Sequence, residues 1–393
     1  SGVHNPLPPQ QLGMNLADLL PTMEGFSTDF VTLYTTNLSA EVFLMEFPEA
    51  VICGEDVTPV MFGASYARGS FDDEQHTVTL LHYPAENTFD TVFVFRLAQD
   101  MSGVDVLREP LTVRTSDESM RTSLSESAPL EWIATLPMLR AEGGLFLTNA
   151  EDLMRNGFFV VDILGTTLVS LRLKLGETRA YPRNAGVTIE YQVIPDPVGD
   201  PEHMVPVSIR FSISALPSSP MQPRVADERV GYFTTVFKDL GDHRANRQGR
   251  GSNLLDTEVR LINKRRMESG DSDPLTYFID PSVPPEWREY MRTGVENWRP
   301  AFEAAGLGSE AIRAVLPGED DWPDDYDAGD IRRFAVHEYN SITWAVDLDR
   351  VFALGPATVD PRTGEILHSG VVFTDGWIEV WSRVFEIYGD SAD

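Results

Sequence analysis

Strict alternation of apolar and polar residues dominates the first half of the chain. In VTIEYQV, the apolar residues Val187, Ile189, Tyr191 and Val193 occupy one side, and VSIRFSIS at 207–214 repeats the pattern. Because successive side chains of a strand point to opposite faces, this alternation predicts half-buried antiparallel strands. Further runs of this kind lie at 30–36, 41–47, 76–83, 91–98, 158–164 and 168–175. The first half is therefore expected to be an antiparallel, β-rich and sandwich-like domain.

A different pattern follows a proline cluster at 217–223, which we interpret as a domain boundary near residue 225. Pro284 and Pro285 suit the first turn of an amphipathic helix, and Pro300 should kink or break that helix. The predicted order is β-α-β-β-β with a closing helix, at 275–280, 284–302, 312–316, 341–347, 364–373 and 376–388. The sequence thus predicts an α+β protein with a β-rich domain at 1–225 and a mixed α/β domain at 226–393.

The net charge of the chain narrows the classes of molecule that it is expected to bind. The chain has 31 Lys and Arg against 61 Asp and Glu, so its formal net charge is −30. Such a field repels nucleic acid and anionic lipid, and it is tolerated best where salt screens it. No nucleic acid partner is expected.

The cellular location of the protein is predicted from several local features of the sequence. No apolar run is long enough to cross a bilayer, and Cys53 is the only cysteine, so no intrachain disulfide can form. The sequence begins with Ser rather than Met, which suggests a processed mature form, and Asn37 opens a glycosylation sequon, Asn-Leu-Ser. We expect an extracellular or secreted protein; a chance tripeptide and a trimmed start are the alternative explanation.

Metal ligands are few. His337 and Glu338 open like a His-Glu-x-x-His motif, but Ser341 occupies the place of the second His, so zinc is not expected there. Calcium is a weak candidate at the acidic stretch EDDWPDDYDAGD, where the oxygen donors are Asp325, Asp327 and Asp330. A solvated acidic loop is the alternative for that stretch.

The sequence shows no complete motif for nucleophilic catalysis, and its basic residues do not by themselves define a binding site. There is no Gly-x-Ser-x-Gly motif, and Cys53 is expected to be an inert buried thiol rather than a plug for a zinc site. Basic residues gather in one segment, either to dock against the acidic surface of the chain or to bind an anionic polysaccharide. They are Lys238, Arg244, Arg247, Arg250, Arg260, Lys264, Arg265 and Arg266.

Three segments carry a resemblance to a known family. They read LPSSPMQPRVADERVGYFTTVFKDL (216–240), YFIDPSVPPEWREYMRTGVENWRPAFEAAGL (277–307) and GPATVDPRTGEILHSGVVF (355–373). Together they resemble zinc-dependent metalloproteases related to the metzincins, whose N-terminal regions are described as domains of unknown function. The β-rich first half is similar more loosely, as in GFFVVDILG at 157–165.

The resemblance implies the first half of a zincin-like catalytic domain, in which an edge strand aligns the peptide substrate through main-chain hydrogen bonds. That strand corresponds to 364–373, with Gly364, Glu365, Ile366, Leu367 and His368 as the substrate-aligning residues. The helix that bears His-Glu-x-x-His has no counterpart up to Asp393, so no catalytic residue is assigned. Zinc is implied by the resemblance, with its ligands on a segment outside these residues.

Two functions from different classes therefore remain open. The first is the N-terminal part of a metzincin-like zinc metalloprotease, which cuts a peptide substrate once the remainder of the protease is present. The second is a non-enzymatic structural, adhesive or assembly protein on a degenerate protease scaffold, whose exposed sheet edge pairs with another chain.

The last predicted helix, 376–388, carries a stripe of large apolar residues that includes Trp377, Trp381 and Phe385. Burial of such side chains is favourable by roughly 1.5 to 3 kcal/mol each, so we expect a further polypeptide to cover them. The remainder of the protease chain, another subunit or a homo-oligomer is the expected partner. The alternative is that the helix folds back on the chain's own sheet.

Overall fold

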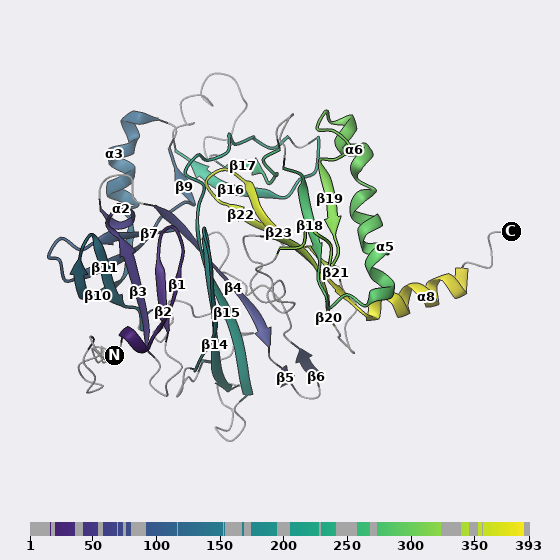
Figure 1. Ribbon diagram of the computed structural model, residues 1–393. Helices are drawn as coiled ribbons and strands as arrows, with labels where there is room; N and C mark the ends of the chain where they lie inside the picture. Colours follow the sequence, from purple (N-terminus) through teal and green to yellow (C-terminus); the bar gives the residue numbers. More distant parts are fainter. Residues whose placement is uncertain are drawn as a thin grey trace.

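A computed structural model describes the fold of most of the chain (Figure 1). The described residues are 16, 20–35, 42–53, 58–68, 70–73, 76–79, 92–115, 117–151, 153, 167–168, 174–194, 205–227, 229–240, 258–267, 273–323, 339–345, 353–355 and 357–388.

A twelve-stranded sheet forms the N-terminal part, and all of its pairings are antiparallel. Its order is β1 (Glu24–Ser27), β2 (Thr32–Thr35), β3 (Phe43–Pro48), β11 (Leu145–Asn149), β10 (Glu131–Glu142), β8 (Gly103–Arg108), β7 (Val92–Leu97), β4 (Pro59–Arg68), β15 (Val205–Ala215), β14 (Asn184–Ile194) and β12 (Thr167–Leu168), with β13 (Lys174–Tyr181) also on β14. Shorter elements here are η2 (Leu20–Thr22), α2 (Glu49–Ile52), β5 (Ser70–Asp73), β6 (His76–Thr79) and α3 (Glu118–Ser127).

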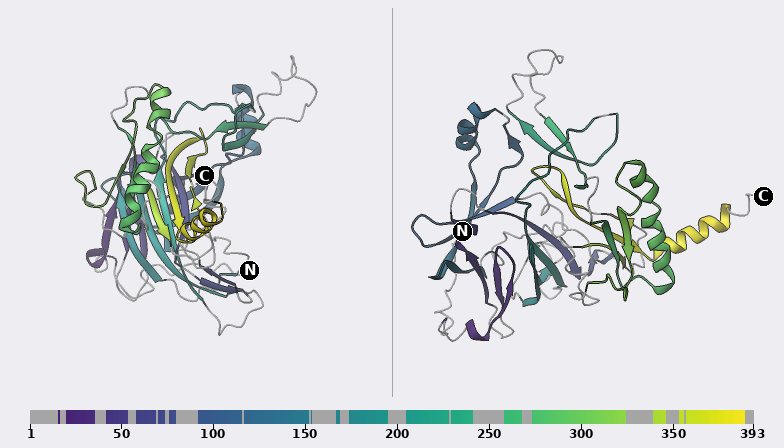
Figure 2. Two further views of the ribbon diagram at one scale, coloured as in Figure 1. Left: turned by 90° about the vertical axis from the view of Figure 1, so that its right-hand side faces the viewer. Right: turned by 45° about the horizontal axis from the view of Figure 1, so that its top comes forward.

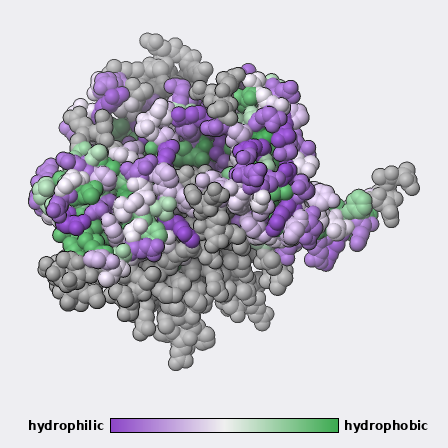
Figure 3. Space-filling view, in the orientation of Figure 1, coloured by the Kyte–Doolittle hydropathy of each residue, from purple (hydrophilic) through white to green (hydrophobic). Residues whose placement is uncertain are grey.

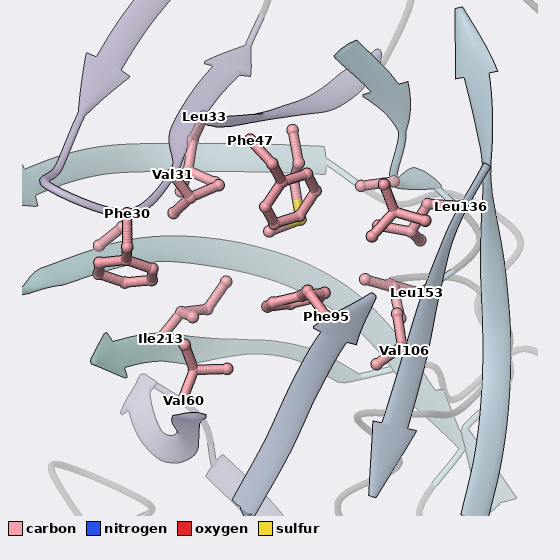
Figure 4. Packing of buried hydrophobic residues seen from close by; sticks show 14 of the residues in the cluster. Phe30, Val31, Leu33, Phe47, Val60, Phe95, Val106, Leu136, Leu153 and Ile213 are labelled. Atoms are coloured by element: carbon pink, nitrogen blue, oxygen red, sulfur yellow. The ribbon is translucent and has the colours of Figure 1, made fainter. Parts of the chain in front are cut away.

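The large sheet curls until its two ends approach each other. The main-chain N–H of Asp29, in the turn between β1 and β2, donates to the carbonyl of Pro182, in the turn between β13 and β14, at 2.7 Å. One hydrophobic core fills the space inside, and Figure 4 shows side chains such as Phe47, Phe95 and Ile213 pointing into it from different strands. The predicted antiparallel β-rich N-terminal part and the α+β class are confirmed.

The alternation of the two longest predicted strands has the expected cause. β14 and β15 pair with Val187 opposite Phe211 and Ile189 opposite Ile209. Val187, Ile189 and Phe211 are fully buried in the core, whereas Thr188 between them is only partly covered. The alternation of side chains along each strand therefore explains why these residues lie on the inner face of the curled sheet.

β3 departs from alternation because both of its faces are covered. Phe43, Met45 and Phe47 face the main core, while Leu44 lies in a second cluster with Leu147. Glu46 is also buried there, and its carboxylate accepts hydrogen bonds from Tyr34 Oη at 3.0 Å and Arg140 at 3.1 Å. Those two donors balance the cost of placing a carboxylate in the interior.

Two local features were not predicted. The β10–β11 hairpin turns at Gly143 and Gly144, whose φ angles are 62° and 78°. α3 begins at Asp117, whose carboxylate accepts from the N–H of Ser119 at 2.9 Å. After β11, the side chain of Asn149 accepts a hydrogen bond from the N–H of Glu151 at 2.9 Å, while the hydroxyl of Thr148 donates to the Met45 carbonyl.

A six-stranded sheet forms the C-terminal part, with four parallel strands and two antiparallel ones (Figures 1 and 2). Its order is β19 (Ile312–Val315), β18 (Leu275–Ile279), β20 (Asn340–Ala345), β23 (Glu365–Thr374) and β21 (Ala353–Leu354), with β22 (Ala357–Asp360) also on β23. The predicted strands and the closing helix α8 (Gly376–Tyr388) are confirmed.

The helix after β18 is interrupted where proline predicted it. α5 (Pro285–Glu296) starts with Pro284 as its N-cap residue, and α6 (Arg299–Ala304) follows with Pro300 in its first turn. Because proline has no N–H to donate, it ends one helix and is tolerated at the start of the next. Trp287, Met291, Val295 and the α6 residue Phe302 cover one face of the sheet.

A small third sheet joins residues from both sides of the predicted boundary at 225. β16 (Thr234–Asp239) pairs antiparallel with β17 (Glu258–Ile262) and parallel with β9 (Val113–Arg114). The division into domains 1–225 and 226–393 remains a prediction, and this sheet is one place where the two parts contact each other.

Candidate functional site

The segment Gly364–His368 was expected to be an open edge that aligns a substrate, but its first part, Gly364–Ile366, has main-chain neighbours on both sides. On one side Val359 and Asp360 of β22 lie opposite Ile366 and Glu365. On the other side Lys264 donates its N–H to the Gly364 carbonyl and accepts from the N–H of Ile366, both at 2.9 Å. The edge-strand interpretation is therefore wrong for Gly364, Glu365 and Ile366, because neighbouring segments already use their main-chain groups. For Leu367 and His368 it stays a prediction.

The turn before this strand, Asp360–Gly364, is held by its own polar groups. Asp360 is fully buried, and its carboxylate accepts from the Arg362 N–H at 2.9 Å and from the Arg362 guanidinium at 2.8 Å. Gly364 has a φ of +78°, and a Cβ added there would lie 2.6 Å from the Ile262 carbonyl oxygen. The DPRTG motif is thus a tight turn packed on β17, and glycine is required at its end.

Two arginines attach this turn to the N-terminal part. Arg362 donates to the Pro217 carbonyl at 3.0 Å. Arg114 of β9 donates to the Arg362 carbonyl at 2.9 Å and to the Pro361 carbonyl, and it stacks 4.1 Å from the ring centre of Phe237. Nearby, burial raises the pKa of Glu109, and the two arginines oppose that rise. We name Glu109, Arg114, Asp360 and Arg362 the arginine clasp.

Arg114→Lys is expected to lower the free energy of unfolding by about 1 to 2 kcal/mol, since an ammonium cannot keep both carbonyl contacts and the stacking on Phe237. Amide hydrogen exchange at Arg362 and Thr363 should accelerate in the same variant. Arg121→Lys is the control, because Arg121 is exposed and pairs only with Glu118 of its own helix; a loss of stability there as large as in Arg114→Lys would contradict this role of the clasp.

A buried polar network connects β23 to the two parallel strands beside it. Arg265 donates to Ser369 Oγ at 2.6 Å and to Asn340 Oδ1, and Ser369 Oγ also lies 2.7 Å from the hydroxyl of Tyr277. Asn340 in turn accepts from the Ser369 N–H at 2.9 Å. Burial lowers the pKa of the Arg265 guanidinium, which remains charged at neutral pH.

His368 lies next to this network and is buried. Its Nε2 is 2.7 Å from the Tyr339 carbonyl. A carbonyl oxygen can only accept, so Nε2 carries the proton of the neutral ring. The pKa of His368 is lowered to about 3, mainly by burial and also by the charge of Arg265, while the bond to Tyr339 acts in the opposite direction. His368 is therefore neutral at physiological pH and packs within the sheet.

Most other candidates from the sequence lie outside the described residues. These are Asn37, His337 and Glu338, the calcium candidates Asp325, Asp327 and Asp330, and the basic residues Arg244, Arg247 and Arg250. Within the part of the chain that the structure describes, no group of three or more His, Cys, Asp or Glu residues is arranged to hold a metal ion.

The described basic residues mostly contact groups of this chain. Arg260 pairs with Glu258 at 2.6 Å, and Arg266 pairs with the buried Glu365 at 2.8 Å. Lys264 Nζ lies 3.3 Å from the sulfur of Met221. Docking against the chain's own surface is therefore the role that Arg260 and Arg266 have, while Arg265 belongs to the buried network.

Cys53 follows α2 and packs, partly covered, against the main core. Burial raises the pKa of its thiol, with the nearby Glu49 adding to the rise. A raised pKa reduces the thiolate fraction, so Cys53 has the character of an inert structural thiol.

The predicted interface residues lie on α8, which extends away from the body of the molecule (Figures 1 and 2). Trp381 is 66% exposed and Phe385 is 76% exposed, while Trp377 is half-buried at the base of the helix, 5.9 Å from Trp381 between ring centres. The alternative prediction was that α8 folds back on the chain's own sheet. In the described residues it does not. No helix among them is long and apolar enough to cross a membrane.

The arginine clasp and the Arg265 network were missed by sequence reasoning. Arg114 and Arg362 are 248 positions apart, and Arg265 contacts Ser369 across 104 positions. Local periodicity carries no information about such pairs. The sequence signals were that Arg362 follows Asp360 by two positions and that Arg265 lies inside the basic segment.

Comparison with known proteins gives one family match. The domain of unknown function DUF5117 matches residues 145–250, which span β11 to the segment after β16. No curated protein and no solved structure matches the chain.

Proposed function

We propose that this chain is the N-terminal part of a metzincin-like zinc metalloprotease. The observation that carries the proposal is the order of the C-terminal elements. Along the chain, β18, the helices α5 and α6, β19, β20, β23 and α8 follow one another as the resemblance of 277–307 and 355–373 to that family implies. The short antiparallel strands β21 and β22 lie between β20 and β23 in the sequence and are additional to that order. The match of 145–250 to a domain of unknown function supports the same resemblance.

In this proposal the described residues supply a scaffold rather than the reacting groups. The arginine clasp and the Arg265 network fix β23, which leads directly into α8. Zinc, when bound by a segment outside these residues, would polarise the scissile carbonyl and activate a water molecule beside a Glu base. Because Gly364–Ile366 is paired on both sides, we propose that the peptide substrate aligns on another edge, and β21 is the outermost described strand on that side of the sheet.

The proposal is tested by the gene and its product. We expect the gene to encode a His-Glu-x-x-His motif downstream of Asp393 in the same reading frame. We also expect the complete product to hydrolyse casein, and residues 1–393 alone not to do so. Hydrolysis should stop with a zinc chelator and return with added zinc. A stop codon directly after Asp393 would contradict the proposal.

The second candidate is a non-enzymatic structural, adhesive or assembly protein built on the same scaffold. The exposed apolar side chains of α8 favour it, because a surface of this kind marks a contact with another polypeptide. The same reading-frame experiment separates the two candidates, since a chain that stops at Asp393 has no place for a zinc helix. An extracellular or secreted location and a possible calcium site belong to both proposals.

A further inference from the structure

α8 leaves the body of the molecule after its first turn. Ile378 packs into the cluster that contains Trp287 and Met291 of α5, which anchors the start of the helix. From Glu379 to Tyr388 every residue of α8 is exposed. Figure 3 shows α8 as a projection with apolar side chains on the part that extends from the body. These exposed residues thus form a rod of roughly 15 Å, at 1.5 Å per residue.

The apolar residues of α8 share one side of this rod. At about 100° per residue, they fall within one continuous half of the helix circumference. The polar residues Glu379, Ser382, Arg383 and Glu386 occupy the other half, where Arg383 pairs with Glu379. The apolar half consists of Trp377, Ile378, Val380, Trp381, Val384, Phe385, Ile387 and Tyr388. A partner could cover this half without burying any charge of α8.

The exposed apolar area matches what a protein dimer needs. Trp381, Phe385, Ile387 and Tyr388 are each more than 60% exposed, and Val384 is about half exposed. With aromatic side chains of 150–250 Å², this amounts to roughly 700 Å² per copy. A stable interface buries about 800 Å² per partner. We propose that a second copy of this chain covers α8, so that the two α8 helices pack against each other around a two-fold axis.

Net charge decides the orientation of the pair. Each copy carries −30, so two bodies side by side would repel strongly. A parallel pair places both bodies at the same end of the rod. An antiparallel pair places them at opposite ends, roughly 15 Å apart, which exceeds the Debye length of about 8 Å at physiological salt. The pair is therefore antiparallel, with Val384 near its middle and Tyr388 near its ends.

Sedimentation equilibrium on residues 1–393 tests the dimer. The wild-type protein should dimerise at micromolar concentrations, and more tightly as salt screens the repulsion between copies. Trp381→Glu should raise the dissociation constant at least about 30-fold, as expected for an aromatic residue at the centre of an interface. Ser382→Glu adds the same charge on the polar half and should leave the constant within about threefold.

Several results would overturn the proposal: a wild-type monomer at all these concentrations, a dimer that Trp381→Glu leaves intact, or equal weakening by Ser382→Glu. A monomer that binds phosphatidylcholine vesicles through α8 would assign the surface to lipid instead. Circular dichroism of both variants checks their folding, which should be unchanged because Trp381 lies beyond the anchored first turn.

Crosslinking gives a second, independent test in a Cys53→Ala background, which removes the single native thiol. Val384→Cys should crosslink between copies with a short bis-maleimide, and Ser382→Cys on the polar half should not. Tyr388→Cys should crosslink only in a parallel pair. Efficient crosslinking at Tyr388 would contradict the antiparallel arrangement.

Discussion

Gly364→Ala is expected to lower the free energy of unfolding by about 3 kcal/mol, although it adds a single methyl group. Two costs combine. The φ of +78° is unfavourable for any residue with a Cβ, and the new Cβ would lie 2.6 Å from the Ile262 carbonyl oxygen, so the backbone of either the turn or β17 must move. Movement there also weakens the hydrogen bond from the Lys264 N–H to the Gly364 carbonyl. Urea unfolding of the two proteins measures the difference.

Gly306→Ala is the matched control for the backbone term alone. Gly306 has a φ of +81°, but nothing lies within 4 Å of a Cβ built there. We expect a loss of about 1 kcal/mol at that position. If both substitutions cost the same, the contact between the DPRTG turn and β17 contributes nothing, and the description of the turn as tightly packed is wrong.

Acidification from pH 6.5 to pH 4 should destabilise the protein by about 3 kcal/mol through His368 alone. The pKa of this buried ring is about 3 in the folded state, below its ordinary value of 6.5. The unfolded chain therefore binds a proton below pH 6.5 that the folded chain does not. The stabilising contribution is fully present above pH 6.5 and is lost as the pH falls towards 3, at about 1.4 kcal/mol per unit.

His368→Gln isolates this contribution, because glutamine can still donate to the Tyr339 carbonyl but does not titrate in this range. The free energy of unfolding of the variant should fall less steeply than that of the wild type between pH 6.5 and pH 4. The carboxylates elsewhere titrate in both proteins, so their effect cancels in the difference. Parallel curves for the two proteins would mean that His368 is not buried in the neutral form.

Local patterns predicted the elements because single residues fix the backbone there. Pro284 and Pro300 set the limits of α5 and α6, and the alternation at 187–193 and 207–214 gave the inner face of β14 and β15. The burial of β3 did not follow from alternation, since Leu44 on its second face is covered by residues from other parts of the chain. Alternation shows which residues share a face but not whether the second face is also buried.

The error at Gly364–Ile366 has a related cause. Whether a strand is an edge depends on what lies beside it, and here the neighbours are Lys264 on one side and β22 on the other. The resemblance suggested an edge, and no residue within 364–368 signals otherwise. The exposure of Trp381 and Phe385, by contrast, was predictable, because the remaining elements offered too little apolar surface to cover α8.

The zinc content of two purified proteins tests the central claim most directly. Residues 1–393 and the complete gene product are dialysed together and analysed by inductively coupled plasma mass spectrometry. The proposed function predicts about one zinc ion per molecule in the complete product and none in residues 1–393, because the sequence up to Asp393 contains no His-Glu-x-x-His motif. Stoichiometric zinc in residues 1–393, or none in either protein, would contradict it.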